Sequence, residues 1–124
     1  LAMKESTIKT KSFQFSLKII DLYKKLKAEK EVVISNQLLR CGTSIGANIE
    51  EAVDGQTMKD FIAKMSIYSK EAKETSYWLR LLKEIEMTMI NVDGQFKDVH
   101  ELIRILISIM KTSQQNVRLN TKNA

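Results

Sequence analysis

Apolar side chains recur along most of the chain at alternating spacings of three and four residues, the period of an amphipathic helix. Four stretches carry this pattern, at about residues 7–30, 35–54, 57–88 and 95–112. Short polar joints separate them, Gly55 and Gly94 lie at two of the joints, and the chain has no proline. The sequence therefore predicts a single all-α domain of four packed helices, with polar ends at residues 1–6 and 113–124 that fray.

Residues 37–52, which read QLLRCGTSIGANIEEA, lie at the centre of this pattern. Two glycines, Gly42 and Gly46, fall one turn apart inside the predicted helix. Glycine in a helix interior costs roughly 1 kcal/mol relative to alanine, so both positions need a compensating reason. We predict close packing there against a neighbouring backbone or a large side chain, with Trp78 and Phe61 as candidate neighbours.

The same stretch, together with DFIAKMSI at residues 60–67, KEA at 70–72 and YWL at 77–79, resembles the four-helix-bundle family of 23S rRNA intervening-sequence proteins. The resemblance covers nearly the whole chain. It implies an up-and-down antiparallel four-helix bundle, often a ring-shaped homopentamer, related to the accessory proteins of diversity-generating retroelements, which bind nucleic acid. It implies no catalytic activity. Cys41 stands where the family usually has serine, so a role for a hydroxyl at this position is in doubt.

Composition predicts a soluble protein and favours, without requiring, polyanionic partners. Its 124 residues can bury a core without disulfides, and a single cysteine cannot form an internal one. No signal segment opens the chain and no apolar run approaches the roughly 20 residues that a membrane span requires, so we expect a cytoplasmic protein without a membrane partner. The net charge of +5 and pI near 9.3 favour polyanions.

Basic residues recur every seven positions in the first and last predicted helices. These residues are Lys4, Lys11, Lys18 and Lys25, and then Lys97, Arg104, Lys111 and Arg118. We predict that Lys11, Lys18, Lys25, Arg104 and Lys111 bind RNA or DNA phosphates without reading base sequence. The alternative is a structural or protein-interaction module whose lysines are only solvated surface.

The last helix carries an apolar stripe beside its main one, formed by Leu102, Ile105 and Ile109. An outer helix of a monomeric bundle needs one stripe, so the second predicts a subunit interface of a homo-oligomer. The alternative is a broad stripe that faces the chain's own core.

Catalysis is not expected. Residues 42–46, GTSIG, match the G-x-S-x-G pattern of a hydrolase nucleophile, but Ser44 follows a helical stretch where that motif needs a strand. The one available base is His100. We therefore predict a non-enzymatic protein with no catalytic residues.

No metal or cofactor is expected either, because one histidine and one cysteine offer no ligand cluster. Adjacent helix positions such as Glu50 and Glu51 diverge by about 100°, so they cannot serve one site. We expect one of them to pair with Arg40 or with a lysine of another helix or subunit. Arg40 itself suits either a buried pair or a phosphate contact, and Glu74 is a candidate to face a partner subunit.

Overall fold

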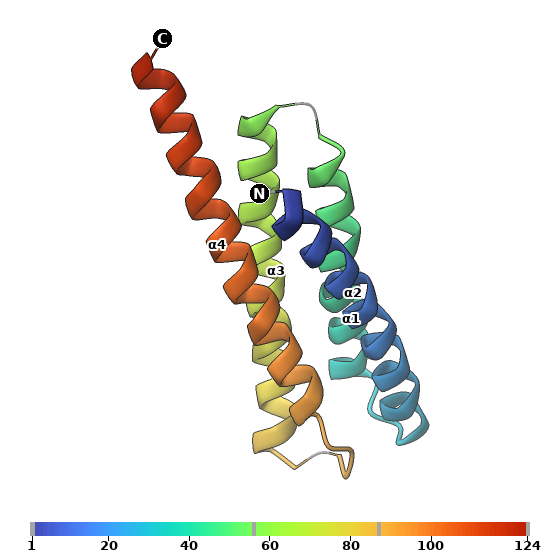
Figure 1. Ribbon diagram of the computed structural model, residues 1–124. Helices are drawn as coiled ribbons and strands as arrows, with labels where there is room; N and C mark the ends of the chain where they lie inside the picture. The colour runs from blue at the N-terminus through green and yellow to red at the C-terminus, as the bar shows by residue number, and fades with distance from the viewer. Residues whose placement is uncertain (1, 56, 87, 124) are drawn as a thin grey trace.

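The structure, a computed structural model, describes residues 2–55, 57–86 and 88–123 (Figure 1). Over these residues it consists of four helices without a β-strand: α1 (Ala2–Ala28), α2 (Val33–Val53), α3 (Met58–Glu84) and α4 (Asp93–Asn123). Each helix packs against the next one in the chain, and α1 closes the bundle against α4. The prediction of an all-α, up-and-down antiparallel four-helix bundle is confirmed. Along the described chain, no helix has a stretch long and apolar enough to cross a membrane.

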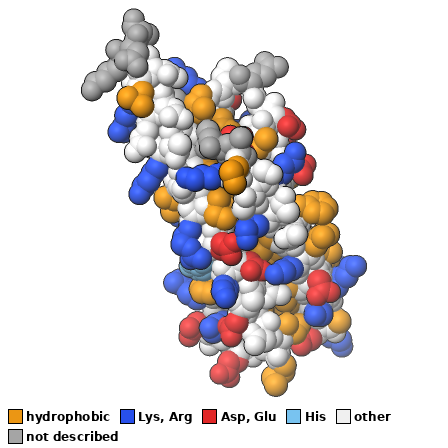
Figure 2. All heavy atoms as spheres, in the orientation of Figure 1, with side chains coloured by type: hydrophobic (Ala, Val, Ile, Leu, Met, Phe, Trp, Pro, Cys, Tyr) orange, Lys and Arg blue, Asp and Glu red, His pale blue; other side chains and the backbone are white. Residues whose placement is uncertain are grey.

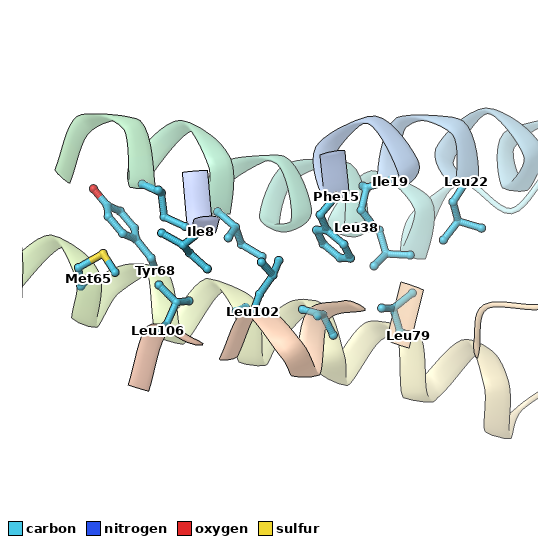
Figure 3. Close-up of a cluster of buried hydrophobic side chains, with 14 of the residues drawn as sticks. Ile8, Phe15, Ile19, Leu22, Leu38, Met65, Tyr68, Leu79, Leu102 and Leu106 are labelled. Carbon is cyan, nitrogen blue, oxygen red and sulfur yellow. The ribbon is translucent and has the colours of Figure 1, made fainter. Parts of the chain in front are cut away.

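All four helices contribute to one apolar core. In Figure 3, Phe15 and Ile19 from α1 face Leu38 from α2, and Leu79 and Leu102 approach them from α3 and α4. These side chains are at most 2% exposed. Burying a side chain of this size contributes roughly 1.5–3 kcal/mol, so the core is the main source of the bundle's stability.

The two glycines of α2 lie where that helix crosses α1. A Cβ atom on Gly42 would lie 3.0 Å from Cγ1 of Ile19. One on Gly46 would lie 3.0 Å from Oγ of Ser16 and 3.3 Å from the backbone oxygen of Ser12. Glycine is therefore needed because the backbone of α1 comes close to α2. The aromatic neighbours expected from the sequence, Trp78 and Phe61, are not the groups that occupy this space.

The joint between α1 and α2 differs from the predicted one. α1 ends with the amide of Lys30 bonded to the Lys27 carbonyl at 2.9 Å and that of Glu31 to the Leu26 carbonyl at 3.0 Å, while Lys30 adopts a φ of 65°. This is a left-handed helix termination that usually takes glycine. The Glu31 carboxylate then accepts from the amides of Ile34 at 3.1 Å and Ser35 at 2.8 Å.

These amides would otherwise lack partners at the start of a helix, so a carboxylate from the preceding turn starts α2. The second helical stretch was predicted to begin at about residue 35, whereas α2 begins at Val33. Helix α3 has an N-cap of its own, because the Thr57 hydroxyl accepts from the Asp60 amide at 3.1 Å.

Both chain ends are more helical than predicted. Helix α1 already includes residues 2–6, and α4 continues past residue 112 to Asn123. No glycine or proline follows Gly94, so nothing in this segment stops a helix once it has begun. The side chains described at 114–116 and 118–121 are all exposed, which agrees with the polar composition that suggested a frayed end.

Candidate nucleic-acid interface

The lysines predicted on α1 are paired with carboxylates. Lys11 pairs with Glu101 of α4, and Lys18 pairs with Asp98 of α4 at 2.6 Å. Lys25 pairs with Asp21 of its own helix at 3.0 Å. Lys11 and Lys18 thus lie along the joint between α1 and α4, and the three charges of this row are each shared with a neighbouring acid.

The basic residues of α4 lie on its outer face. Lys97, Arg104, Lys111 and Arg118 are all exposed, and no carboxylate within the described ranges lies within ion-pair distance of them. Figure 2 shows Lys and Arg side chains gathered along α4, on the left of the molecule. Seven residues of helix correspond to about 10.5 Å, so consecutive cations follow one another at about that interval. We call these four residues the α4 cation row.

One carboxylate interrupts the positive charge beside this row. The hydrogen bond from Lys11 and the charge of Lys11 lower the pKa of Glu101, and the nearby charges of Arg104 and Lys97 act in the same direction. Glu101 therefore remains ionised at neutral pH. It offsets part of the positive potential of this face.

A groove follows the joint between α1 and α4. One hollow, with a volume of about 160 Å³, lies between the Lys11–Glu101 and Lys18–Asp98 pairs, with Gln14, Phe15 and Leu102 at its walls. A second, of about 390 Å³, is lined by Met3, Lys4, Thr7, Arg104, Ile105 and Ser108. The Lys4 ammonium donates to the Ser108 hydroxyl across it at 2.8 Å. The groove thus has lysines and Arg104 along its rims.

Arg40 lies at the joint between α2 and α3, where it pairs with Glu74 and lies 3.5 Å from Oε2 of Glu71. Burial opposes the charged guanidinium, but the hydrogen bond and charge of Glu74 outweigh it and raise the pKa of Arg40. With two carboxylates beside it, this arginine joins helices of one chain. Lys64 of α3 pairs with Glu51 of α2 at 3.3 Å, while Glu50 is exposed.

The second apolar stripe of α4 requires a correction. Leu102 and Ile109 are 2% and 0% exposed, because α4 turns them into the chain's own core. They are therefore part of the broad core-facing stripe and cannot form a subunit interface. Ile105 is half-buried at the groove between α1 and α4.

The residues considered for catalysis are separated in space. The Ser44 hydroxyl donates to the backbone oxygen of Cys41 at 2.8 Å within α2. His100 of α4 instead lies with Nε2 3.0 Å from the Ser76 hydroxyl of α3. Helices α2 and α4 are diagonal in the bundle, so the arrangement that a serine hydrolase needs is not formed by Ser44 and His100.

Cys41 is a buried thiol. Burial raises its pKa to about 11, and the Thr75 hydroxyl lies 3.1 Å from its sulfur. It therefore remains protonated at neutral pH and has low reactivity. Among the residues that the structure describes, no three His, Cys, Asp or Glu side chains are grouped in a way that could hold a metal ion.

Sequence reasoning missed the partners of the α1 lysines. Asp98 and Glu101 are three residues apart on the side of α4 that faces α1, and this spacing is visible in the sequence. Which helix they face depends on the packing order of the bundle. The heptad of lysines alone does not contain that information.

Comparison with known proteins agrees with the fold and the sequence motifs. The model of the 23S rRNA-intervening sequence protein family matches residues 4–111. The chain is also similar to a crystal structure of a protein with unknown function from the S23 ribosomal protein family of Bacteroides thetaiotaomicron. The two share 47% sequence identity with a TM-score of 0.82, over 87% of this chain and 98% of that one. No curated protein matches. The chain belongs to the family of 23S rRNA-intervening sequence proteins.

Proposed function

We propose that this protein is a non-enzymatic, self-associating helical protein that binds RNA or DNA through the α4 cation row. The supporting observation is that these four exposed cations lie on one helix without a carboxylate partner in the described chain, whereas the three α1 lysines are each paired. An unpaired row can exchange its counterions for phosphates without first breaking an ion pair.

The spacing of the row suits a phosphate backbone. Cations about 10.5 Å apart along a helix correspond to about three base steps of 3.4 Å along the axis of a DNA duplex. Contacts of this kind fix the position of a strand without reading its bases. The family name refers to 23S rRNA, which is compatible with an RNA ligand.

The α1 lysines have a secondary role in this proposal. A phosphate that approaches Lys11 or Lys18 must compete with Glu101 or Asp98. These residues would add to the attraction at long range but contribute less to the bound state. Arg40 is assigned to the joint between α2 and α3, because two carboxylates already lie beside it.

The pairing of Lys11, Lys18 and Lys25 favours the second candidate function. It is a structural or protein-interaction module without a nucleic-acid ligand, in which every lysine is ordinary surface. Exposed ion pairs of this kind contribute about 0–1 kcal/mol each and are common on helical proteins. The two functions make different predictions for the affinity to RNA or DNA. Removing the unpaired cations of α4 should weaken that affinity only if the α4 cation row is the binding site.

The test is the affinity for a labelled structured RNA and a matched DNA duplex, titrated over several salt concentrations. The substitutions Lys97→Gln, Arg104→Gln and Lys111→Gln are combined in one variant. We expect weaker binding and a log–log salt slope that is shallower by about 0.9 for each duplex phosphate contact removed. For single-stranded segments, the expected change is about 0.7 per contact.

The matched control combines Lys59→Gln, Lys70→Gln and Lys73→Gln, three exposed residues of α3. It changes the net charge by the same amount and should keep nearly the wild-type slope. Equal losses in the two variants would mean that only overall charge matters, and the α4 cation row would be rejected as the site. No binding by the wild-type protein at low salt would favour the interaction module.

A further inference from the structure

The α4 cation row has two chemically different sides. On the side that faces α1, the carboxylates of Asp98 and Glu101 follow the row, and each pairs with a lysine of α1. From residue 94 to the end of the chain, these two are the only acidic residues. On the other side, residues 75–83 of α3 contain no carboxylate at all. Charge therefore directs a phosphate strand on the row toward α3 and away from α1.

Two contacts fix how α3 and α4 lie beside each other (Figure 1). The Ser76 hydroxyl oxygen lies 3.0 Å from Nε2 of His100. Farther along α3, the Lys83 ammonium lies 3.0 Å from a carboxylate oxygen of Asp93. Arg80 follows Ser76 by four positions and precedes Lys83 by three, so it lies on the same face of α3. Arg80 is thus at the joint with α4, level with the first turns of that helix.

Arg80 adds a cation to this end of the row. The row begins at Lys97, in the first turns of α4, so Arg80 lies across the joint from its first member. Arg80 is exposed, and none of the described carboxylates lies within ion-pair distance of it. Its guanidinium carbon lies 5.8 Å from the centre of the Tyr77 ring. A free cation and an aromatic ring are therefore next to each other on the outer surface of α3.

The Tyr77 ring is accessible and held in place. Its side chain is 48% exposed, and Phe13 is the one other exposed side chain among the described Phe, Tyr and Trp residues. The ring of Trp78, which packs against the core, meets the Tyr77 ring edge to face, with 5.5 Å between the centroids. A ring held by a half-buried neighbour loses little conformational freedom when a ligand stacks on it.

We propose that Tyr77 and Arg80 form a binding site for one unpaired nucleotide. The base stacks on the Tyr77 ring, and Arg80 and Lys97 hold the adjacent phosphates. Stacking accepts any base, because every base has a π-face, whereas paired bases already stack on one another within a duplex. The inference rests on the proposed function and names its ligand class, which is a single-stranded segment such as a loop or an end.

The test compares two single strands of equal length, an oligothymidylate and its stable abasic analogue, which have the same phosphates. We expect the full-length wild-type protein to bind the oligothymidylate more tightly by about 5- to 150-fold, the contribution of one stacked base. Tyr77→Ala should lose this preference by binding the oligothymidylate more weakly, with unchanged affinity for the abasic strand. Tyr77→Phe, which keeps the ring, should keep the preference.

The matched control is Phe13→Ala, which removes the other exposed ring. Phe13 is two positions from Lys11, which faces α4, and two helix positions are about 200° apart. The Phe13 side chain is therefore directed away from α4. This variant should keep the wild-type preference for the strand with bases.

Arg80→Gln tests the phosphate contact. It should weaken the binding of both strands alike and make the log–log salt slope shallower by about 0.7, the value for one phosphate of a single strand. Lys59→Gln, at an exposed position near the start of α3, is its control and should keep the wild-type slope. Tyr77→Ala removes no charge, so its slope should stay unchanged.

Trp78 provides an independent readout, because it is the single tryptophan of the chain and its ring contacts that of Tyr77. At saturation, the oligothymidylate should change the fluorescence of Trp78, and the abasic strand should not. An equal response to both strands would contradict a base stacked at Tyr77.

Equal affinity of the wild-type protein for the two strands would overturn the site and leave the α4 cation row standing. So would a Tyr77→Ala variant that retains the wild-type preference, or a wild-type protein that binds a duplex but no single strand. An unchanged slope for Arg80→Gln would overturn the assigned phosphate contact. If the wild-type protein binds neither single strands nor a duplex at low salt, the proposed function fails together with the site.

Discussion

At the scale of single residues, packing explains the unusual sequence of α2. Glycine destabilises a helix interior, and on this ground alone Gly42 and Gly46 were predicted to mark a close approach of another element. The structure places α1 against both. The neighbours of Gly46 could not be predicted, because small residues such as Ser12 and Ser16 leave no hydrophobic signal in a sequence. The Glu31 cap of α2 was missed for a related reason, since it requires a turn that returns the carboxylate to the helix start.

Gly46→Leu tests this contact. The new side chain would begin 3.0 Å from Oγ of Ser16 and 3.3 Å from the backbone oxygen of Ser12, and a backbone cannot move aside without displacing α1. We expect a loss of at least about 1–3 kcal/mol in the free energy of unfolding, measured by urea denaturation. Ala47→Leu, on the exposed neighbour, is the control. Equal stability of the two variants would contradict the close approach.

At the scale of elements, the sequence predicted four helices with their core-facing sides but not how far each extends. The third ended four residues early, at Glu84, and the fourth ran to Asn123. A polar composition predicts that a segment buries little, but it does not prevent the segment from continuing a helix.

Removing residues 114–124 tests the role of the end of α4. The described side chains beyond Ser113 are exposed, whereas Ser113 itself is buried, so the shortened chain retains the core. We expect an unfolding free energy within about 0.5 kcal/mol of wild type, since surface positions rarely contribute more. Circular dichroism should show the loss of helical signal from the removed turns. Removing residues 109–124 should lower the free energy of unfolding clearly more, because this longer truncation also removes Ile109, which is fully buried.

At the scale of the whole molecule, charge is distributed unequally. The net charge of +5 was known from composition, but only the structure separates paired lysines on α1 from unpaired cations on α4. This separation narrows the proposed binding site from both helices to α4. Periodicity alone gave both rows equal weight, because a heptad of lysines has the same sequence pattern whether or not an acid lies opposite.

Glu101→Gln tests the balance of charge on this face. The substitution frees Lys11 from its partner and removes a negative charge beside the α4 cation row, so we expect tighter binding to RNA or duplex DNA at neutral pH. Glu84→Gln, with the same change of net charge at the end of α3, should change affinity less. An equal gain in affinity for Glu101→Gln and Glu84→Gln would contradict a local effect of the Glu101 charge.

The same pair predicts a pH dependence. Because Lys11 lowers the pKa of Glu101, the stabilisation from the pair is present above the ordinary carboxyl pKa of about 4.3 and is lost as the pH falls through the lowered value. The affinity difference between wild type and Glu101→Gln should disappear over the same acidic range, where wild-type Glu101 becomes neutral.

The order of helix contacts also has a consequence for how the chain folds. Three of the four joints connect helices that follow one another in sequence, so each can form by closing a short loop. The fourth joins residues far apart, such as Lys18 with Asp98, which are 80 positions apart, and Lys4 with Ser108, which are 104 apart. Mostly local contacts favour fast folding, and the entropy of loop closure grows only slowly with length. Helix α4 should therefore dock onto α1 last, with little added delay.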